Sequence, residues 1–342
     1  MLGGGGFVAQ NKVLPGSYIN FVNSNAVTST IGERGVVAIM LPLNKKAGEV
    51  IEITSADFVT KCEELTGKNF DAKEIAPLRE IFCNAKKVYV YDLGEGGTVA
   101  EGIAALGAYE FNVVCAYSED VTTYITAGKK WRDEMGKKCQ VVVYNQSKPD
   151  YEGIINVVST VSDENVDAYA LVAWVAGAEA ACAVNSSCTN MAYDGEYTIV
   201  CNKSQSDLEK CITDGQLAFH LVYGEVRVLE DINSLTTTSA EKSEDFKYNQ
   251  TIRVVDQIAN DIAKLFNTKY LGKIANNPAG RVSLWADIVK HHRTLEELNA
   301  IENFNATAVT VEQGNTKKSV VINDVITVVN AMAQLYMTVV VQ

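Results

Sequence analysis

Residues 335–341 constrain this chain more than any other segment, because they are rich in aromatic and β-branched side chains and carry no charge. Such a run favours a β-strand, and a strand of this kind needs pairing along its edges to avoid aggregation. A second strand-like segment, residues 16–22, follows a glycine run at residues 3–6. Two strand-like arms, one near each end, predict subunits that lend strands to their neighbours and so build a polymer. The open alternative is that both arms pair within their own subunit.

Length and composition indicate a folded protein with more than one domain. The 342 residues suffice for two or three domains, and 47% hydrophobic with 21% charged residues is typical of chains with substantial cores. A net charge of −12 argues against a nucleic-acid partner, which requires a basic face. The most apolar stretch, residues 168–184, is short and contains Glu179, and the first residues lack the pattern of a signal peptide. We therefore expect no direct membrane insertion.

The cysteines and histidines argue against a metal or disulfide framework. None of the eight cysteines forms a C-x-x-C pair, and several lie in apolar, strand-like runs. The three histidines are His220, His291 and His292, and the last two flank an apolar helical stripe. We expect reduced, buried thiols in a protein made in a cytoplasm, no metal site and no cofactor.

The pattern of apolar runs predicts an α/β multidomain protein. Short strands near residues 36–40 and 49–53 indicate a small β-rich domain over residues 26–86. From residue 87 to 225, buried strands alternate with helices, which is typical of a parallel α/β sheet and defines the middle domain. Its expected strands are 88–91, 113–117, 140–144 and 197–201, and its expected helices lie near 98–109, 121–135, 150–161 and 168–184.

A third unit, residues 226–330, is predicted to be an α+β C-terminal assembly domain. Apolar residues recur at helical spacing over about 251–267 and 283–301, and two strand-like runs within 308–323 are joined by a turn, as in a β-hairpin. The N-terminal arm would be residues 1–25 and the C-terminal arm residues 331–342. The fold class expected is thus α/β with exchanged terminal strands.

Several segments together resemble contractile phage tail sheath proteins, above all the short sheaths of Firmicutes phages and of phage-tail-like bacteriocins. The likeness is strongest over residues 226–342 and covers most of the chain in the same order. The segments that carry it are RVLEDINSL at 227–235, IRVVDQIANDI at 252–262, NPAGRVSLW at 277–285, AM at 331–332 and YMTV at 336–339, with PGSYI at 15–19 and GERG at 32–35 near the front.

The resemblance implies a structural subunit and not an enzyme. Such subunits would polymerise by strand exchange into stacked hexameric rings around a tail tube, with the tube, the baseplate and the tail terminator as partners. The implied donor strands include Tyr18, Ile19, Phe21 and Val22 at the front and Tyr336, Met337, Val339 and Val341 at the end. The implied acceptor hairpin, residues 307–325, includes Val309, Val311, Val320 and Ile322.

The resemblance also implies a mechanism and a location. Linkers at about 23–27 and 326–334 would tether the arms, so that bodies could rotate during contraction while every strand stays paired. Basic residues on the C-terminal helices, for which we name Lys264 and Arg293, would face an acidic tube. The protein would belong to a virion tail or a phage-tail-like particle, made in the bacterial host cytoplasm.

A soluble α/β enzyme is the alternative reading. Residues 94–97, Gly-Glu-Gly-Gly, follow a predicted strand and precede a helix, where nucleotide-binding loops occur. The run falls short of G-x-G-x-x-G, and a tight turn explains the glycines equally well. A hydrolase triad lacks support, because no G-x-S-x-G elbow is present.

Overall fold

The computed structural model describes residues 31–341, and its largest element is a six-stranded sheet. The strand order is β2-β3-β1-β4-β5-β6, and all neighbours are parallel except β2, which is antiparallel to β3. The strands are β1 (Val36–Leu41), β2 (Val50–Thr54), β3 (Lys87–Asp92), β4 (Val113–Cys115), β5 (Gln140–Tyr144) and β6 (Ile154–Val157).

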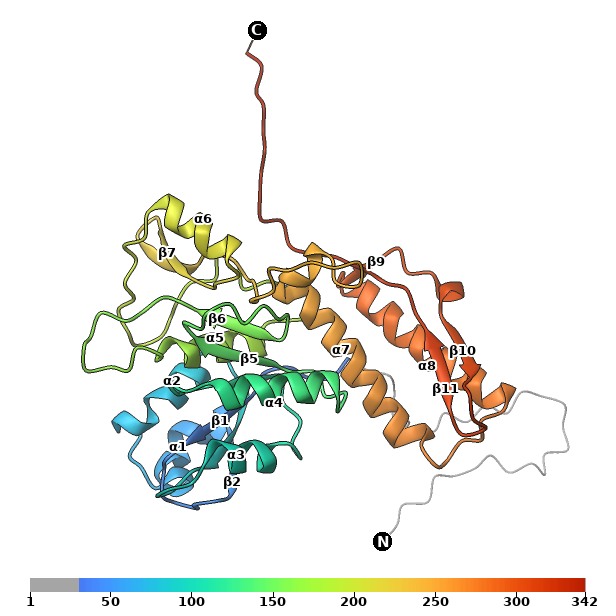
Figure 1. Ribbon diagram of the computed structural model, residues 1–342, viewed down its shortest axis with the longest axis horizontal. Helices are drawn as coiled ribbons and strands as arrows, with labels where there is room; N and C mark the ends of the chain where they lie inside the picture. Colours follow the sequence, from blue (N-terminus) through green and yellow to red (C-terminus); the bar gives the residue numbers. More distant parts are fainter. Residues whose placement is uncertain (1–30, 342) are drawn as a thin grey trace, which may run out of the picture.

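Helices cover both faces of the sheet and produce two apolar cores (Figure 1). They are α1 (Ser55–Thr66), α2 (Ala76–Phe82), α3 (Val99–Leu106), α4 (Thr122–Asp133) and α5 (Leu171–Ala181). Helices α1, α2 and α5 pack on the face that contains Ile39, whereas α3 and α4 pack on the face that contains Met40, as strand alternation requires. Helices α2 and α5 approach so closely that a Cβ at Gly177 would lie 2.4 Å from the carbonyl oxygen of Ile81.

The sheet corrects three expectations. Residues 26–86 are not a separate β-rich unit, because β1 pairs with β3 and β4, and β2 with β3. The expected helix at 150–161 is wrong: its β-branched run forms β6, which extends the sheet beside β5. Residues 197–201 form no strand and pair only through the Val161–Ile199 bridge. The expected helices at 98–109, 121–135 and 168–184 correspond to α3, α4 and α5.

The C-terminal unit is built on two antiparallel helices beside the α/β part (Figure 1). Leu265 of the first packs with Leu284 of the second, and Val254 packs with Leu295. The remaining elements are α6 (Gln205–Thr213), β7 (Phe219–Val222), β8 (Glu225–Val228), α7 (Asn249–Leu265), α8 (Pro278–Glu297), β9 (Ile301–Glu302), β10 (Thr310–Gln313), β11 (Val320–Asn323) and β12 (Thr327–Val328). Both predicted helices and the predicted hairpin, β10–β11, are therefore present.

Candidate functional site

The β10–β11 hairpin is a two-stranded antiparallel sheet against α8. Val311 pairs with Ile322 and Gln313 with Val320. The hairpin is fixed where β10 begins: Val309 is buried, and its carbonyl accepts a hydrogen bond from the Trp285 indole N–H at 3.0 Å. Among the described residues neither outer edge of the hairpin is paired with another strand. The four expected acceptor residues thus lie on or beside one small sheet that offers free edges.

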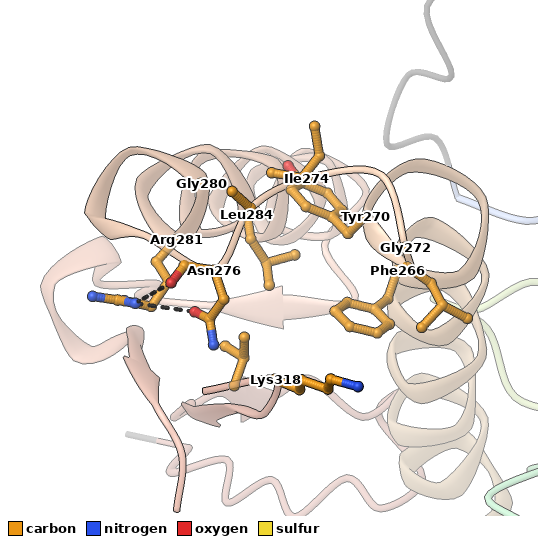
Figure 2. Close-up of a pocket in the computed structure, with 12 residues that line it drawn as sticks. Phe266, Tyr270, Gly272, Ile274, Asn276, Gly280, Arg281, Leu284 and Lys318 are labelled. Carbon is orange, nitrogen blue, oxygen red and sulfur yellow. Dashed lines mark hydrogen bonds between the residues drawn. The ribbon is translucent and has the colours of Figure 1, made fainter. Parts of the chain in front are cut away.

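A pocket of about 100 Å³ lies beside this hairpin, between the end of α7, the start of α8 and β11 (Figure 2). Its apolar wall includes Phe266, Leu284 and Val320, one of the expected acceptor residues. At its rim, Arg281 Nη1 donates to Asn276 Oδ1 at 3.0 Å. The pocket therefore offers apolar surface next to the hairpin.

The C-terminal arm leaves the body as an extended chain without internal secondary structure (Figure 1). Its large apolar side chains are exposed on both faces: Leu335 86%, Tyr336 87%, Met337 76%, Val339 68%, Val340 80% and Val341 90%. Runs of exposed apolar residues of this kind are typical of interaction surfaces. The N-terminal donor residues Tyr18, Ile19, Phe21 and Val22 lie outside the described residues.

The root of the C-terminal arm is held firmly on the body. Strand β12 pairs with β9, and the N–H of Val329 donates to Ala300 O at 3.0 Å. The buried amide of Gln250 then donates to Val329 O at 3.1 Å and accepts from the N–H of Ala331 at 2.9 Å. The linker expected at 326–334 is therefore shorter than predicted, because residues up to 331 are hydrogen-bonded to the body.

The root of the N-terminal arm is held by the same helix. Gly32 N–H donates to both carboxylate oxygens of Asp261, at 3.1 and 3.2 Å, and Gln257 donates to Gly32 O at 3.3 Å. Two residues later, the Arg34 guanidinium donates to the carbonyls of Glu179 and Cys182. Helix α7 thus fixes both arm roots.

Buried charges attach α7 to the α/β part. Arg253 lies within 2.6 Å of Glu179 and 3.3 Å of Asp231, and all three side chains are essentially inaccessible. Burial, with Asp231 nearby, raises the pKa of Glu179 well above its ordinary value. Although burial opposes it, Arg253 and hydrogen bonds lower the pKa of Asp231. Arg253 is therefore part of an internal charge cluster and not of an exposed basic face.

A second buried pair lies further along α7. Arg132 of α4 holds the Asp256 carboxylate with both terminal nitrogens, at 2.5 and 2.9 Å. Removing one member of such a pair typically costs about 3–5 kcal/mol, because the other charge stays buried. The α/β part and α7 are therefore expected to behave as one rigid body.

The cluster around Arg253, and not the Arg132–Asp256 pair, contains the candidate metal ligands of the described residues. Ligand atoms of Glu179, Cys188 and Asp231 lie within 4.8 Å of one another. Arg253 already supplies positive charge to both carboxylates, so the arrangement is an internal ion pair. All eight cysteines are free thiols.

Comparison with known proteins identifies the family. The family model of the phage tail sheath protein central domain matches residues 95–234, and that of the phage tail sheath C-terminal domain matches residues 241–342. The tail sheath protein of Clostridium phage phiCD119 is 30% identical over 268 residues, which cover 75% of this chain and 74% of that protein. This chain belongs to the phage tail sheath protein family.

Solved structures share the fold of this sheath protein. The sheath tail protein of Desulfitobacterium hafniense superposes with a TM-score of 0.79 at 24% identity, covering 94% of this chain and 99% of that one. The contracted helical sheath of the anti-feeding prophage gives 0.71 at 17%, covering 96% and 99%. The expected family is confirmed, and it is a family of structural proteins of contractile injection systems. Among the helices of residues 31–341, none is long and apolar enough to cross a membrane.

The glycine turn at residues 94–97 donates a backbone hydrogen bond to a carboxylate of the sheath protein itself, that of Asp92. Asp92, at the end of β3, accepts hydrogen bonds from five backbone N–H groups, including that of Gly94 at 3.0 Å and that of Lys45 at 2.7 Å. Although burial opposes it, these donors lower the pKa of Asp92. The N-terminus of α3 is capped internally by Thr98 and Glu101. Several donors of this turn, the N–H groups of Gly94, Gly97 and Thr98, are thus already used within the chain, which disfavours a phosphate site here.

The two residues expected to face a tube are both exposed, on different helices of the sheath protein. Lys264 lies 3.7 Å from Glu110, and Arg293 has no ion-pair partner among residues 31–341. Their orientation towards a tube stays a prediction.

Proposed function

We propose that this sheath protein assembles by exchanging terminal strands, so that stacked hexameric rings surround a tail tube and contract to drive it through a cell envelope. The observation that carries the proposal is the exposed, apolar C-terminal arm, whose root is fixed while the rest extends away from the body. A free-edged hairpin on the same chain is a suitable acceptor. Main-chain hydrogen bonds would give such a contact its strength, and alternate side chains its register.

Burial of the arm supplies the driving force. A fully buried Val, Leu or Met side chain contributes about 1.5–3 kcal/mol, which offsets most of the cost of ordering the arm, about 1–2 kcal/mol per residue for the backbone. The main-chain hydrogen bonds of the exchanged strand then add to the balance. The pocket beside Val320 would accept one such side chain. Because donor and acceptor are different surfaces, the contact is heterologous and permits an open helical assembly.

Contraction would then move rigid bodies connected by paired strands. The buried ion pairs of α7 keep each body intact, and the flexible tether begins after residue 331. The extended sheath would be kinetically trapped, and new contacts between bodies would stabilise the contracted one. Tube, baseplate and tail terminator would be the partners, in a virion tail or a phage-tail-like particle whose subunits are made in the host cytoplasm.

Proline substitution tests strand exchange without shortening the chain. Val339→Pro removes an N–H from the proposed donor strand and should abolish polymerisation while leaving a folded subunit. Ala333→Pro, in the tether, is the matched control and should still assemble. Sedimentation and electron microscopy distinguish tubes from single subunits. Normal tubes from Val339→Pro would refute donation of this strand, as would unfolding caused by deletion of residues 335–342.

A further inference from the structure

Two adjacent histidines of α8 are buried, and strand exchange gives them no role. His291 and His292 are 1% and 0% exposed. His291 Nε2 lies 2.9 Å from Asp261 Oδ2, and His292 Nε2 lies 2.5 Å from Asp324 Oδ2. The two Nδ1 atoms face each other at 3.3 Å. These four side chains form one continuous sequence of contacts, which we call the Asp–His–His–Asp row.

The two ends of the row meet the two arm roots. Asp261 accepts from the Gly32 N–H, close to the start of the described residues. Asp324 lies between β11 of the hairpin and β12, which leads into the C-terminal arm. The row therefore connects both arm roots with the end of the acceptor hairpin through two buried imidazoles, and Asp324 is its more exposed end.

The row needs more hydrogens than its members ordinarily carry. Three contacts require three hydrogens, one in each. Two ionised carboxylates are acceptors only, and two neutral imidazoles bring one N–H each, which makes two. If both N–H groups serve the carboxylates, two bare Nδ1 atoms face each other, and unpaired buried acceptors are costly. The same count holds if a carboxyl group carries the extra hydrogen.

We propose that the Asp–His–His–Asp row binds one additional proton, and that this proton couples the roots of the two arms. Asp261 stays an acceptor, because Gly32 and Gln257 also donate to it. The proton therefore lies on the histidine pair or on Asp324.

Other charged groups near the row are engaged elsewhere. Glu296, also on α8, accepts from the backbone N–H of Phe304, whose ring packs beside His292. From the N-terminal root, Arg34 turns to backbone carbonyls near α5. Among the described residues, the two imidazoles thus hydrogen-bond only with each other and with Asp261 and Asp324.

The additional proton makes the row dependent on pH. Above the pH at which the unfolded chain releases it, the folded chain still holds the proton, so stability decreases as pH rises. A difference of one proton changes the ratio of folded to unfolded protein tenfold per pH unit. The effect ends once the folded row has also lost its proton.

The variant Asp324→Asn tests for the additional proton, because it can keep all three contacts of the row without that proton. The side-chain amide introduced by this substitution can donate to His292 Nε2, His292 can then donate through Nδ1 to His291, and His291 to Asp261. All three contacts are made by neutral imidazoles, so the variant should lose the one-proton dependence. We expect the folded-to-unfolded ratio of wild type, relative to this variant, to fall up to tenfold per pH unit as pH rises from about 5 to about 9, a range that includes histidine titration.

Guanidinium unfolding of the full-length protein measures this ratio, with His220→Asn as the control. His220 lies on β7, and burial lowers its pKa, so its replacement removes a pH dependence of its own. Introduced into both proteins, His220→Asn should leave the difference in slope between wild type and Asp324→Asn unchanged. A pH-independent difference between wild type and Asp324→Asn would overturn the proposal.

Spectroscopy of the unaltered protein provides a second test. Labelling histidine with ¹⁵N places isotopes at three residues only. In assembled particles at about pH 6, solid-state NMR should detect a protonated Nδ1 hydrogen-bonded to a second Nδ1; two bare Nδ1 atoms at every pH would refute the count. The additional proton is inferred from the contacts of the row alone, whereas its role in assembly rests on the proposed strand exchange. Either inference can therefore fail without the other.

Discussion

Replacing Gln250 by leucine should release the root of the C-terminal arm and leave the fold intact. The Gln250 amide makes two hydrogen bonds to the arm backbone, to Val329 O and to the Ala331 N–H. Leucine has a similar volume and favours helices equally well, but it can make neither bond. The substitution therefore removes the attachment and keeps the packing of α7.

The size of the effect follows from these two bonds. Each contributes about 0.5–1.5 kcal/mol net, so the pair contributes about 1–3 kcal/mol to docking of residues 329–331. Losing that amount makes opening of the segment about 5- to 150-fold more frequent. Global stability should change less, because β12 and the Val329 N–H remain attached to β9 and Ala300.

Hydrogen exchange at the Ala331 amide measures this opening, since that N–H is held by Gln250. Mass spectrometry of overlapping peptides should show exchange faster by the stated factor in Gln250→Leu. The matched control is Gln257→Leu, the same change two turns along α7, which should affect Gly32 and not Ala331. Unchanged Ala331 exchange in Gln250→Leu, or equal acceleration in both variants, would contradict this account of the arm root.

Three further predictions concern charge and thiols. Burial raises the pKa of Glu80 to about 7, so the folded chain holds a proton that the unfolded chain releases, and stability should fall as pH rises from 4.5 to about 7. Glu80→Gln should flatten that fall in melting temperature; an unchanged pH profile would show that Glu80 is not responsible. Exposed charges are screened over about 10 Å at 0.1 M salt, so reversing Lys264 and Arg293 to Glu should cost sheath–tube association and spare sheath–sheath association; unchanged sheathed tubes would exclude these two residues. Reductant should alter neither the mass nor the stability of assembled particles, and a disulfide between Cys182 and Cys188 would show otherwise.

The sequence predicted the elements of the C-terminal unit well, because their signals are local. Both helices have apolar residues at helical spacing, and the hairpin has two β-branched runs around a turn. The exposed C-terminal arm also follows from its composition. In contrast, the run at 150–161 was misread as a helix, because only its neighbour β5 provides the edge that makes it a strand.

The arm roots could not be predicted, because they depend on polar residues from distant segments. Gln250, Gln257 and Asp261 look like the ordinary polar face of an amphipathic helix, yet each holds an arm. Arg253 lies on the same helix, and only its partners, Glu179 on α5 and Asp231, show that it is buried. Periodicity indicates where apolar residues gather and says little about which polar residues are buried with them.

Helix α7 explains why these polar side chains occur together. Gln250 and Gln257 are seven residues apart, which places them on one face about 10 Å apart. Gln250 holds the root of the C-terminal arm and Gln257 holds Gly32, so these two attachment points keep a fixed spacing however the body rotates. If neighbours exchange strands as proposed, force between subunits passes from one arm to the other through this helix. The buried pairs of Arg253 and Arg132 then join that force-transmitting helix to the α/β body. Apolar contacts would also stabilise the joint, but paired charges fix its geometry, because a shifted α7 would leave charges buried without partners.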